Sequence, residues 1–382
     1  MPQDVKRVCI VTALAGPGPI SGGVWEVVVN QARALMENGI NVSIVAGWLG
    51  ARPPRELRGL EVSLVPVRAP APGLRLRALV GKGWAGAVAR AATGADIAHV
   101  HLCRDLLTMP ATRTIRRLGI PIVAQTHGML APPRSRGFRL FDLVMTTPAI
   151  RRVQQFITLT DQERPVLEEL GVGPSKIATV PNAVPDPLIA WHPVTPARLL
   201  FAARLHAGKQ VLVFAKTVAR LRQHGHLVEG IIAGPDHGDL ARLRQFIETG
   251  GHDAYIRYVG ELDREQLTAQ FATATAFVMP SVAESFGLTL VEAMSVGTPT
   301  VSTTETPLAE QLKAHAAAVV TPPNEASLSA DLDRLLRSPG LQRSLSARGR
   351  AMYEANWTTD VMLRRLLAVY ATALHERAAD QR

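Results

Sequence analysis

Four segments near the start of the chain decide the fold: VCIVTALA at 8–15, GPGPISGG at 16–23, VWEVVVNQARALMEN at 24–38 and NVSIVA at 41–46. The first and last pieces are short apolar runs, which are typical of strands buried on both faces. Between them, apolar residues recur at 24, 27, 28, 32 and 35, the spacing of one helix face. The stretch therefore predicts a strand, a helix and a parallel second strand.

The same alternation continues along the chain. Further strands are predicted in the first half at 97–101, 120–126, 157–160 and 177–180. Four prolines within 185–196 then indicate a linker. The pattern restarts with strands at 199–203, 228–233, 255–258, 276–279, 300–302 and 318–320, and with helices at 211–222, 326–336 and 360–375. We predict an α/β protein of two Rossmann-like, doubly wound domains that face a central cleft and bind ligands at the carboxyl ends of their strands.

Composition excludes several classes of protein. The chain has 382 residues, of which 47% are hydrophobic, so it is not a disordered protein. It contains no apolar run of the length that a spanning helix needs, and its 2 cysteines cannot build a disulfide framework or a cysteine-rich metal site. Residues 6–15 resemble a signal peptide, but they continue into a glycine loop and a helix, so a buried strand and a cytoplasmic location are expected.

Positive charge is concentrated in the first half of the chain. The net charge is +10, and 22 Lys and Arg against 13 Asp and Glu within 1–190 supply nearly all of it. This asymmetry suggests that the first half binds an anionic partner, either a membrane surface or an acidic acceptor. The alternative is an arginine-rich surface without a partner. Nucleic acid is the least favoured partner, because no nucleic-acid-binding motif accompanies the charge. The predicted basic amphipathic patch for an anionic membrane comprises Arg68, Arg75, Arg77, Lys82 and Arg90, with Leu74, Leu76, Leu79, Val80 and Trp84 between them.

Two loops carry candidate ligand-binding residues. Glycines at 16–23 let a ligand approach the start of a helix, but Ser21 occupies the third glycine position of a dinucleotide fingerprint. The second strand also ends without an acidic ribose ligand, so an NAD site is disfavoured. In the second half, Arg204 and Lys209 flank a glycine turn after a predicted strand. The two cations can converge on a diphosphate, or they belong to an ordinary exposed loop.

The strongest local signal is ESFGLTLVEAMSVGTP at 284–299. Gly287 precedes a short helix that ends at Gly297, and the free amides of Leu288 and Thr289 can bind phosphate oxygens.

Two carboxylates accompany this helix. Glu292 leans back toward the helix N-terminus, where it suits ribose hydroxyls, although an ordinary acid favoured by the helix dipole is the alternative. Glu284, on the preceding loop, suits the hydroxyls of a sugar.

The pairing of Arg204 and Lys209 with Glu284 and Glu292 resembles the retaining glycosyltransferases of family 4, which have the GT-B fold of two Rossmann-like domains. Weaker matching segments occur in the right order at 21–23, 181–184, 232–235, 258–260 and 357 onward. Ala183 stands where the family usually has glycine. The resemblance predicts an acceptor-binding domain at 1–190, a nucleotide-sugar-binding domain at 191–356 and a helix at 357–382 that packs back toward the first domain.

The resemblance also implies roles for individual residues. His127 matches the histidine that contacts the donor sugar, and independently it ends a buried strand before a glycine, although a core histidine is the alternative. Apart from the resemblance, Trp25, beside the glycine loop, and His101, near the end of its strand, are weaker candidates for acceptor binding. The implied catalytic residues are His127, Glu284, Arg204 and Lys209. The implied donor-binding residues are Gly22, Gly23, Arg204, Lys209, Gly234, Val259, Glu284, Phe286, Gly287, Leu288, Thr289 and Glu292.

The implied reaction is transfer of a hexose from a nucleotide sugar with retention of configuration, in which the leaving phosphate takes the acceptor proton. No metal and no cofactor are expected, because the Arg–Lys pair would neutralise the diphosphate. A UDP-sugar is favoured over a GDP-sugar. The expected acceptor is a saccharide, a lipid-linked saccharide or a small molecule in polysaccharide or glycoconjugate biosynthesis. The alternatives are a catalytically silent scaffold subunit of this fold and a sugar-nucleotide epimerase.

Overall fold

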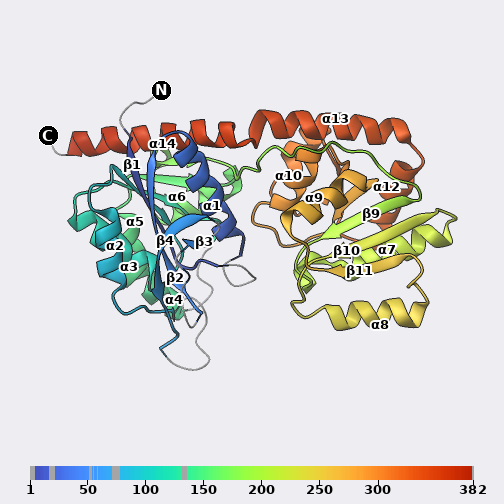
Figure 1. Cartoon of the computed structure of the whole chain (residues 1–382), viewed down its shortest axis with the longest axis horizontal. Coiled ribbons are helices and arrows are strands. Elements are labelled where there is room, and N and C mark those ends of the chain that lie inside the picture. The colour runs from blue at the N-terminus through green and yellow to red at the C-terminus, as the bar shows by residue number, and fades with distance from the viewer. Residues whose placement is uncertain are drawn as a thin grey trace. The chain divides into compact units, whose positions relative to one another are not determined.

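The chain folds into two α/β units, each built around its own sheet (Figure 1). The computed structural model describes residues 5–16, 22–50, 54, 56–57, 59–70, 78–130 and 136–380. Unit 1 comprises Met1–Asn182 and Thr359–Arg382, and unit 2 comprises Ala183–Thr358. The predicted fold class, two Rossmann-like doubly wound domains, is confirmed.

Unit 1 contains an eight-stranded sheet in the order β3-β4-β2-β1-β5-β6-β7-β8. All neighbours pair in parallel except β3 and β4, which form an antiparallel hairpin. The strands are β1 (Arg7–Thr12), β2 (Asn41–Trp48), β3 (Glu56–Leu57), β4 (Leu60–Pro66), β5 (Ile97–His101), β6 (Ile122–Gln125), β7 (Gln155–Thr158) and β8 (Ile177–Thr179). The helices are α1 (Gly22–Glu37), α2 (Trp84–Ala92), α3 (Thr108–Arg117), α4 (Arg136–Phe141), a π-helical turn (Asp142–Thr146), α5 (Thr147–Ile150), α6 (Arg164–Glu169) and α14 (Thr359–Asp380).

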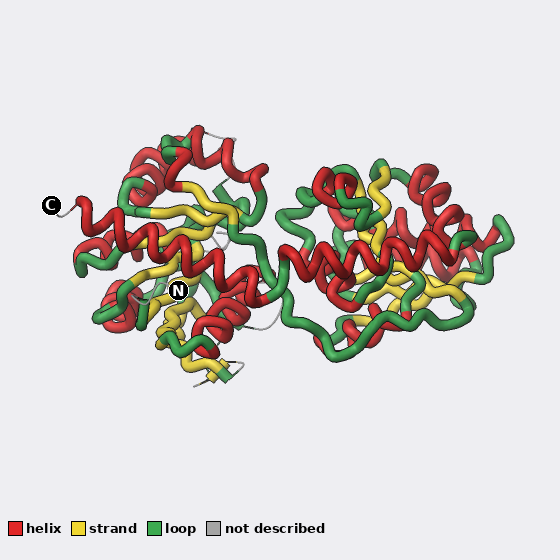
Figure 2. The backbone as a smooth tube through the Cα atoms, turned by 90° about the horizontal axis from the view of Figure 1, so that it is seen from above, coloured by secondary structure: helices red, strands yellow, loops and turns green. Residues whose placement is uncertain are grey.

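Unit 2 contains a six-stranded parallel sheet in the order β11-β10-β9-β12-β13-β14. Its strands are β9 (Ala197–Ala202), β10 (Val228–Ala233), β11 (Ile256–Gly260), β12 (Ala276–Met279), β13 (Thr300–Thr303) and β14 (Val319–Thr321). Its helices are α7 (Val211–Gln223), α8 (Leu240–Gly250), α9 (Arg264–Thr273), α10 (Leu288–Val296), α11 (Ala309–Ala314), α12 (Glu325–Leu336) and α13 (Pro339–Asn356). Within each unit, Figure 2 shows the strands between layers of helices.

Each sheet has a point where the direction of strand addition reverses. In unit 1 the chain adds β2 and β4 on one side of β1 and then β5 to β8 on the other. In unit 2 it adds β10 and β11 on one side of β9 and then β12 to β14 on the other. Loops at the carboxyl ends of the two strands that flank such a reversal diverge, and this divergence leaves a crevice for ligands. The topology therefore predicts ligand-binding crevices at the loops after β1 and β5 in unit 1 and at the loops after β9 and β12 in unit 2.

The last helix of the chain belongs to unit 1, although unit 2 intervenes in the sequence. In Figure 1, α14 runs beside α1 and the sheet of unit 1, and it contacts α1, β6 and β7. Leu366 and Tyr370 are fully buried, and Gln155 Nε2 donates to Glu376 Oε1 at 2.7 Å. Burial of an apolar side chain of this size contributes about 1.5–3 kcal/mol, so α14 is an integral part of the core of unit 1.

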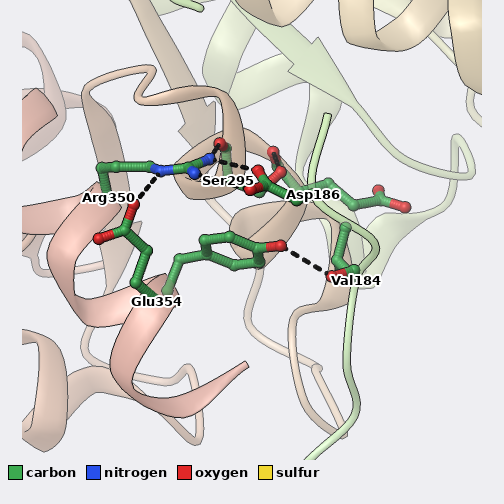
Figure 3. Close-up of polar contacts among 7 residues, drawn as sticks. Val184, Asp186, Ser295, Arg350 and Glu354 are labelled. Atoms are coloured by element: carbon green, nitrogen blue, oxygen red, sulfur yellow. Dashed lines mark hydrogen bonds and ion pairs between the residues drawn. The ribbon is translucent and has the colours of Figure 1, made fainter. Parts of the chain in front are cut away.

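In unit 2, α13 holds the segment that follows Asn182 (Figure 3). Arg350 on α13 forms a bidentate ion pair with Asp186, at 2.7 and 3.0 Å, and donates to Glu354 Oε1 at 2.7 Å. Tyr353 donates its hydroxyl to the carbonyl of Val184 at 2.9 Å. These contacts to Val184 and Asp186 explain why the chain passes into unit 2 directly after Asn182.

Candidate functional site

In unit 2, two loops meet at the reversal point of the sheet. The β9 loop (203–210) follows β9, and the β12 loop (280–287) follows β12, its neighbour in the sheet. Val282 donates its amide to the carbonyl of Gly208 at 2.9 Å, so the two loops are bonded to each other. A β-carbon on Gly208 would lie 3.1 Å from that of Ala283, so this contact leaves little room for a larger residue.

Lys209 and Glu284, one from each loop, form a direct ion pair. Their side chains are 10% and 12% exposed, and Lys209 Nζ also donates to the carbonyl of Ala283 at 3.1 Å. The sequence predicted separate roles for them, Lys209 on the diphosphate and Glu284 on the sugar. The structure brings the two residues together, so each charge sets the position of the other.

Arg204 lies at the start of the β9 loop and is exposed, with no ion pair or hydrogen bond to any residue that the structure describes. His206, between the two cations, caps the following turn by accepting a hydrogen bond from the amide of Gly208 at 3.2 Å. Burial lowers the pKa of His206, and the charges of Lys209 and then Arg204 lower it further. The loop is thus electropositive, as an anion-binding loop requires.

The helix α10 starts at the end of the β12 loop, as predicted. Gly287 has φ +92°, a left-handed conformation that favours glycine, and Gly297 closes the helix at φ +87°. Leu288 and Thr289 are the first two helical residues, so their amides have no carbonyl one turn earlier to bond. Glu292, half-buried, lies one turn further along. The helix therefore begins with two amides that make no intrahelical hydrogen bond, at the end of the loop that carries Glu284.

Three other predicted donor-binding residues of unit 2 differ in exposure. Gly234, which follows β10, has φ +130°, and a β-carbon there would lie 2.0 Å from the carbonyl oxygen of Ala203, so only glycine fits beside the β9 loop. Val259 on β11 is 41% exposed, which leaves its surface open to a ligand. Phe286 is buried, so its side chain supports the β12 loop from inside.

In unit 1, three histidine rings stack at the carboxyl ends of β5 and β6; we call His99, His101 and His127 the histidine column. The ring centroids of His99 and His101 lie 4.7 Å apart, and those of His101 and His127 lie 5.0 Å apart. His101 Nδ1 is hydrogen-bonded to His127 Nε2 at 2.7 Å, and His99 Nδ1 to the hydroxyl of Tyr370 on α14 at 2.9 Å. Burial lowers the pKa of His99 and of His127 to about 3 each, and it lowers the pKa of His101 well below its ordinary value.

The turn that carries His127 is held by a half-buried glutamate that the sequence analysis missed. His127 has φ +51°, which is uncommon for a residue with a β-carbon. Glu163 accepts hydrogen bonds from the amide of Gly128 at 2.7 Å, the amide of Leu159 at 2.8 Å and the hydroxyl of Thr126 at 3.1 Å. A signal existed in the sequence, since Thr160 and Glu163 have the spacing of a capping box. Strain of this kind clusters at functional sites.

The remaining predicted residues of unit 1 lie partly at the start of α1 and partly in the core. Gly22 and Gly23 form the first turn of α1, whereas Ser21 lies outside the described residues. Trp25 is 1% exposed, so it lies in the core and offers no surface to an acceptor. His101 is likewise buried and contacts His127.

Among the described apolar members of the predicted basic amphipathic patch, two are buried and Val80 is 38% exposed. Leu79 and Trp84 are buried in the core of unit 1, and Trp84 Nε1 donates to the carbonyl of Leu107 at 2.9 Å. Arg75 and Arg77 lie outside the described residues, together with Leu74 and Leu76.

Within the described ranges, no group of three or more His, Cys, Asp or Glu side chains is arranged to hold a metal ion. Among the helices that the structure describes, none combines the length and the apolar character that a membrane crossing requires.

The chain matches two family models, "Glycosyltransferase Family 4" over residues 21–186 and "Glycosyl transferases group 1" over residues 191–352. It is 26% identical to D-inositol 3-phosphate glycosyltransferase 1 of Catenulispora acidiphila, over 98% of this chain and 96% of that protein. It is 30% identical to the 2-deoxystreptamine glucosyltransferase of Streptomyces kanamyceticus, over 71% of this chain and 78% of that protein. Its fold is similar to that of Anabaena Alr3699/HepE, solved in complex with UDP-glucose, with a TM-score of 0.73 and 14% identity over 96% of this chain and 99% of that one. The chain belongs to the family 4, group 1 glycosyltransferases of the GT-B fold.

Proposed function

We propose that this glycosyltransferase transfers a hexose from a nucleotide diphosphate sugar to an acceptor with retention of anomeric configuration and without a metal ion. The observation that carries the proposal is the arrangement at the reversal point of unit 2. The β9 loop, which carries Lys209 and the exposed Arg204, is hydrogen-bonded to the β12 loop, and α10 begins at the end of that second loop. Two cations and a helix N-terminus supply positive charge for a diphosphate without a divalent ion.

Each residue has a defined task in this proposal. Arg204 and Lys209 bind the diphosphate, the amides of Leu288 and Thr289 bind its oxygens, and Glu292 accepts hydrogen bonds from the ribose. Glu284, oriented by Lys209, binds the hydroxyls of the transferred sugar. Only glycine at position 234 permits the close approach to the carbonyl of Ala203, and we assign the neighbouring end of β10 to the nucleoside.

In the proposed reaction, the bond between the anomeric carbon and the diphosphate oxygen breaks while the acceptor oxygen bonds to the same face of that carbon. The leaving diphosphate oxygen takes the acceptor proton, so no separate base is needed. Charge develops on the leaving group, and Arg204 and Lys209 stabilise it. His127 in unit 1 is neutral near pH 7, because burial lowers its pKa to about 3, and it supplies a hydrogen bond to the sugar rather than a proton.

A nucleotide screen tests the proposal. UDP should raise the melting temperature more than GDP, and transfer from a UDP-hexose should give a product with the anomeric configuration of the donor, read by NMR coupling constants. Activity should persist in EDTA. Absence of stabilisation by any nucleoside diphosphate favours the silent scaffold, isomerisation of the nucleotide sugar favours the epimerase, and loss of turnover in EDTA restored by Mg²⁺ excludes a metal-free reaction.

We further propose that the acceptor is a saccharide held at the anionic cytoplasmic face of a membrane, as in polysaccharide or glycoconjugate synthesis. The support is an arginine surface of unit 1, formed by Arg113 and Arg116 on α3 and by Arg152. Burial lowers the pKa of Arg152, and the neighbouring charges of Arg113 and Arg116 lower it further. None of the three forms an ion pair within the described residues. Asp142, the only acidic residue at 113–152, is paired with Arg104 at 2.6 Å.

Liposome sedimentation tests this location. The protein should bind phosphatidylglycerol vesicles at low salt and release them at high salt, since each arginine near such a surface contributes about 1 kcal/mol. Arg113→Glu with Arg116→Glu should abolish binding, whereas Arg242→Glu with Arg244→Glu on α8 should not. A wild-type protein that ignores these vesicles at low salt has a soluble acceptor instead.

A further inference from the structure

The histidine column has one hydrogen bond whose direction can be derived. His101 lies on β5, and His127 follows the neighbouring strand β6, where His101 pairs with Gln125 in parallel register. The bond between His101 Nδ1 and His127 Nε2, at 2.7 Å, joins two nitrogens, so one ring must donate and the other must accept. Both rings are neutral near pH 7, because burial lowers their pKa values far below 6.5. Each ring therefore carries one N–H, and two assignments remain.

The surroundings of His101 decide between them. Its second nitrogen, Nε2, is fully buried and has no hydrogen-bond partner among the described residues. If His127 donated, His101 would have to carry its proton on this Nε2, as a buried donor without an acceptor. Leaving such a group unpaired is strongly unfavourable. If His101 donates from Nδ1, its only N–H is bonded, and Nε2 is left with an unpaired lone pair instead of an unpaired N–H. Buried N–H groups without an acceptor are rarer in folded proteins than under-satisfied acceptors, so this assignment is favoured.

We propose that His101 is a positioning residue that donates from Nδ1 to His127 Nε2 and thereby fixes His127 as the Nδ1–H tautomer. Nδ1 of His127 has no partner among the described residues, and His127 keeps 6% of its surface exposed while His101 keeps 1%. His127 then presents a neutral N–H donor, which suits an oxygen of a sugar; this identification of the ligand rests on the proposed function, whereas the tautomer does not.

The surrounding contacts hold the two rings in this geometry. Glu163 bonds the amide of Gly128 directly after His127, which fixes the left-handed turn. On the other side, His99 stacks on His101 with planes 16° apart, and Tyr370 bonds His99. His101 is thus confined between two rings and cannot turn its Nδ1 elsewhere without opening the core.

Nitrogen NMR on the full chain labelled with ¹⁵N-histidine tests the tautomer directly. In the wild type, His127 should show a protonated Nδ1 and an unprotonated Nε2 at pH 7, and His101 should show the same pattern. His127→Gln assigns the signals by subtraction. A His127 ring protonated on Nε2 in the wild type would overturn the inference without any further variant.

Two variants of equal shape separate positioning from packing. The side-chain amide of His101→Asn can place Nδ2 where the imidazole has Nδ1 and donate to His127, whereas His101→Leu has no donor. We expect His101→Asn to keep the Nδ1–H tautomer of His127 and His101→Leu to lose it. Tyr370→Phe, which removes a bond to His99 only, should leave the tautomer unchanged. Equal His127 spectra in the Asn and Leu variants would contradict the proposal.

Kinetics distinguish failure of this inference from failure of the proposed function. With a UDP-hexose as donor, His101→Leu should lower kcat about tenfold, the loss of roughly one hydrogen bond, while the affinity for UDP alone stays unchanged. His101→Asn should recover most of that loss. If the NMR pattern is found but no nucleotide sugar is used, the positioning role stands and the proposed function falls. If the enzyme is active and both variants lose kcat equally, the positioning role falls.

Discussion

The histidine column of unit 1 and the two loops of unit 2 differ in how they treat charge: the column lies on β5 and β6, next to the reversal point of its sheet, and the loops lie at the reversal point of theirs. In the column, burial excludes charge, and His99, His101 and His127 are already bonded to protein groups. In the loops, the charged groups are retained and some polar groups stay accessible to a ligand. Arg204 is exposed, and the first two amides of α10 make no intrahelical hydrogen bond.

The difference teaches which features of each unit are built before a ligand arrives. A neutral ring contributes only a hydrogen bond, so its value depends on orientation, and packing supplies that orientation. A diphosphate brings its own charge, so the loops need positive potential more than a fixed geometry. Unit 1 should therefore respond to changes in packing and protonation, and unit 2 to removal of single charges.

Acid should break the comparison most strongly, because the largest lowering of histidine pKa values lies in unit 1. The folded pKa of His99 and His127 is about 3, against about 6.5 in the unfolded chain, so the unfolded chain binds more protons in this window. Stability is lost as the pH falls below about 6.5, by about 1.4 kcal/mol per pH unit for each ring that stays neutral. Hydrogen exchange at pH 7 and pH 5, corrected for intrinsic rates, should show β5 and β6 losing protection while β9 and β10 keep theirs. Equal losses in both units would contradict this account.

Removal of Lys209 should give the largest effect in unit 2. Lys209→Ala leaves Glu284 in a mostly buried position without its cation, and breaking such a pair costs about 3–5 kcal/mol. We expect a lower melting temperature and at least a hundredfold loss in kcat/KM for the donor. Lys216→Ala, at an exposed position of α7, is the matched control and should change neither. A Lys209→Ala protein with full stability would show that the ion pair is dispensable.

Removal of Arg204 should sharpen the contrast, because this charge has no ion pair or hydrogen bond with any residue in the described part of the chain. Arg204→Ala should lower kcat/KM about tenfold through one lost charge-assisted bond, with an unchanged melting temperature. The exposed Arg244 on α8 offers a control with the same change in net charge. Steady-state kinetics with a UDP-hexose and thermal unfolding decide the point. A fall in melting temperature for Arg204→Ala would mean that the arginine has a structural role.

The smallest effects should separate the two glutamates. Glu292→Gln should weaken the binding of free UDP several-fold, since a neutral amide accepts ribose hydrogen bonds less well. Glu284→Gln should leave UDP affinity nearly unchanged and slow transfer instead. Calorimetry with UDP and single-turnover kinetics measure the two quantities. Equal loss of UDP affinity in both variants would refute this division of roles.

The buried strands were the most predictable part of the fold. The predicted strands at 97–101, 228–233 and 276–279 coincide with β5, β10 and β12, because continuous apolar runs between turn signals have few other solutions. The hairpin of β3 and β4 was missed. Arg52, Pro53 and Pro54 precede it, and its residues Glu56 and Glu61 pair across an edge where no apolar run is needed.

The site was predictable only where neighbours in sequence form it. Gly287, Gly297 and the helix between them follow from local stop signals. The contact between His99 and Tyr370 joins residues 271 positions apart, which no local pattern contains. For Trp25 a local pattern was misleading. Its position beside a glycine loop suggested a ligand contact, but its side chain, on α1, lies in the core.

The place of α14 has a consequence for synthesis on the ribosome. Unit 1 needs Thr359–Asp380 to complete its core, yet these residues emerge only after all of unit 2 has been made. Unit 2 is continuous in sequence and can close first, which reverses the usual order in which the N-terminal domain folds first. Until then, the surface that Leu366 and Tyr370 cover stays open to water and to chaperones. The bond from Tyr370 to His99 therefore forms only once the nascent chain has delivered its final helix.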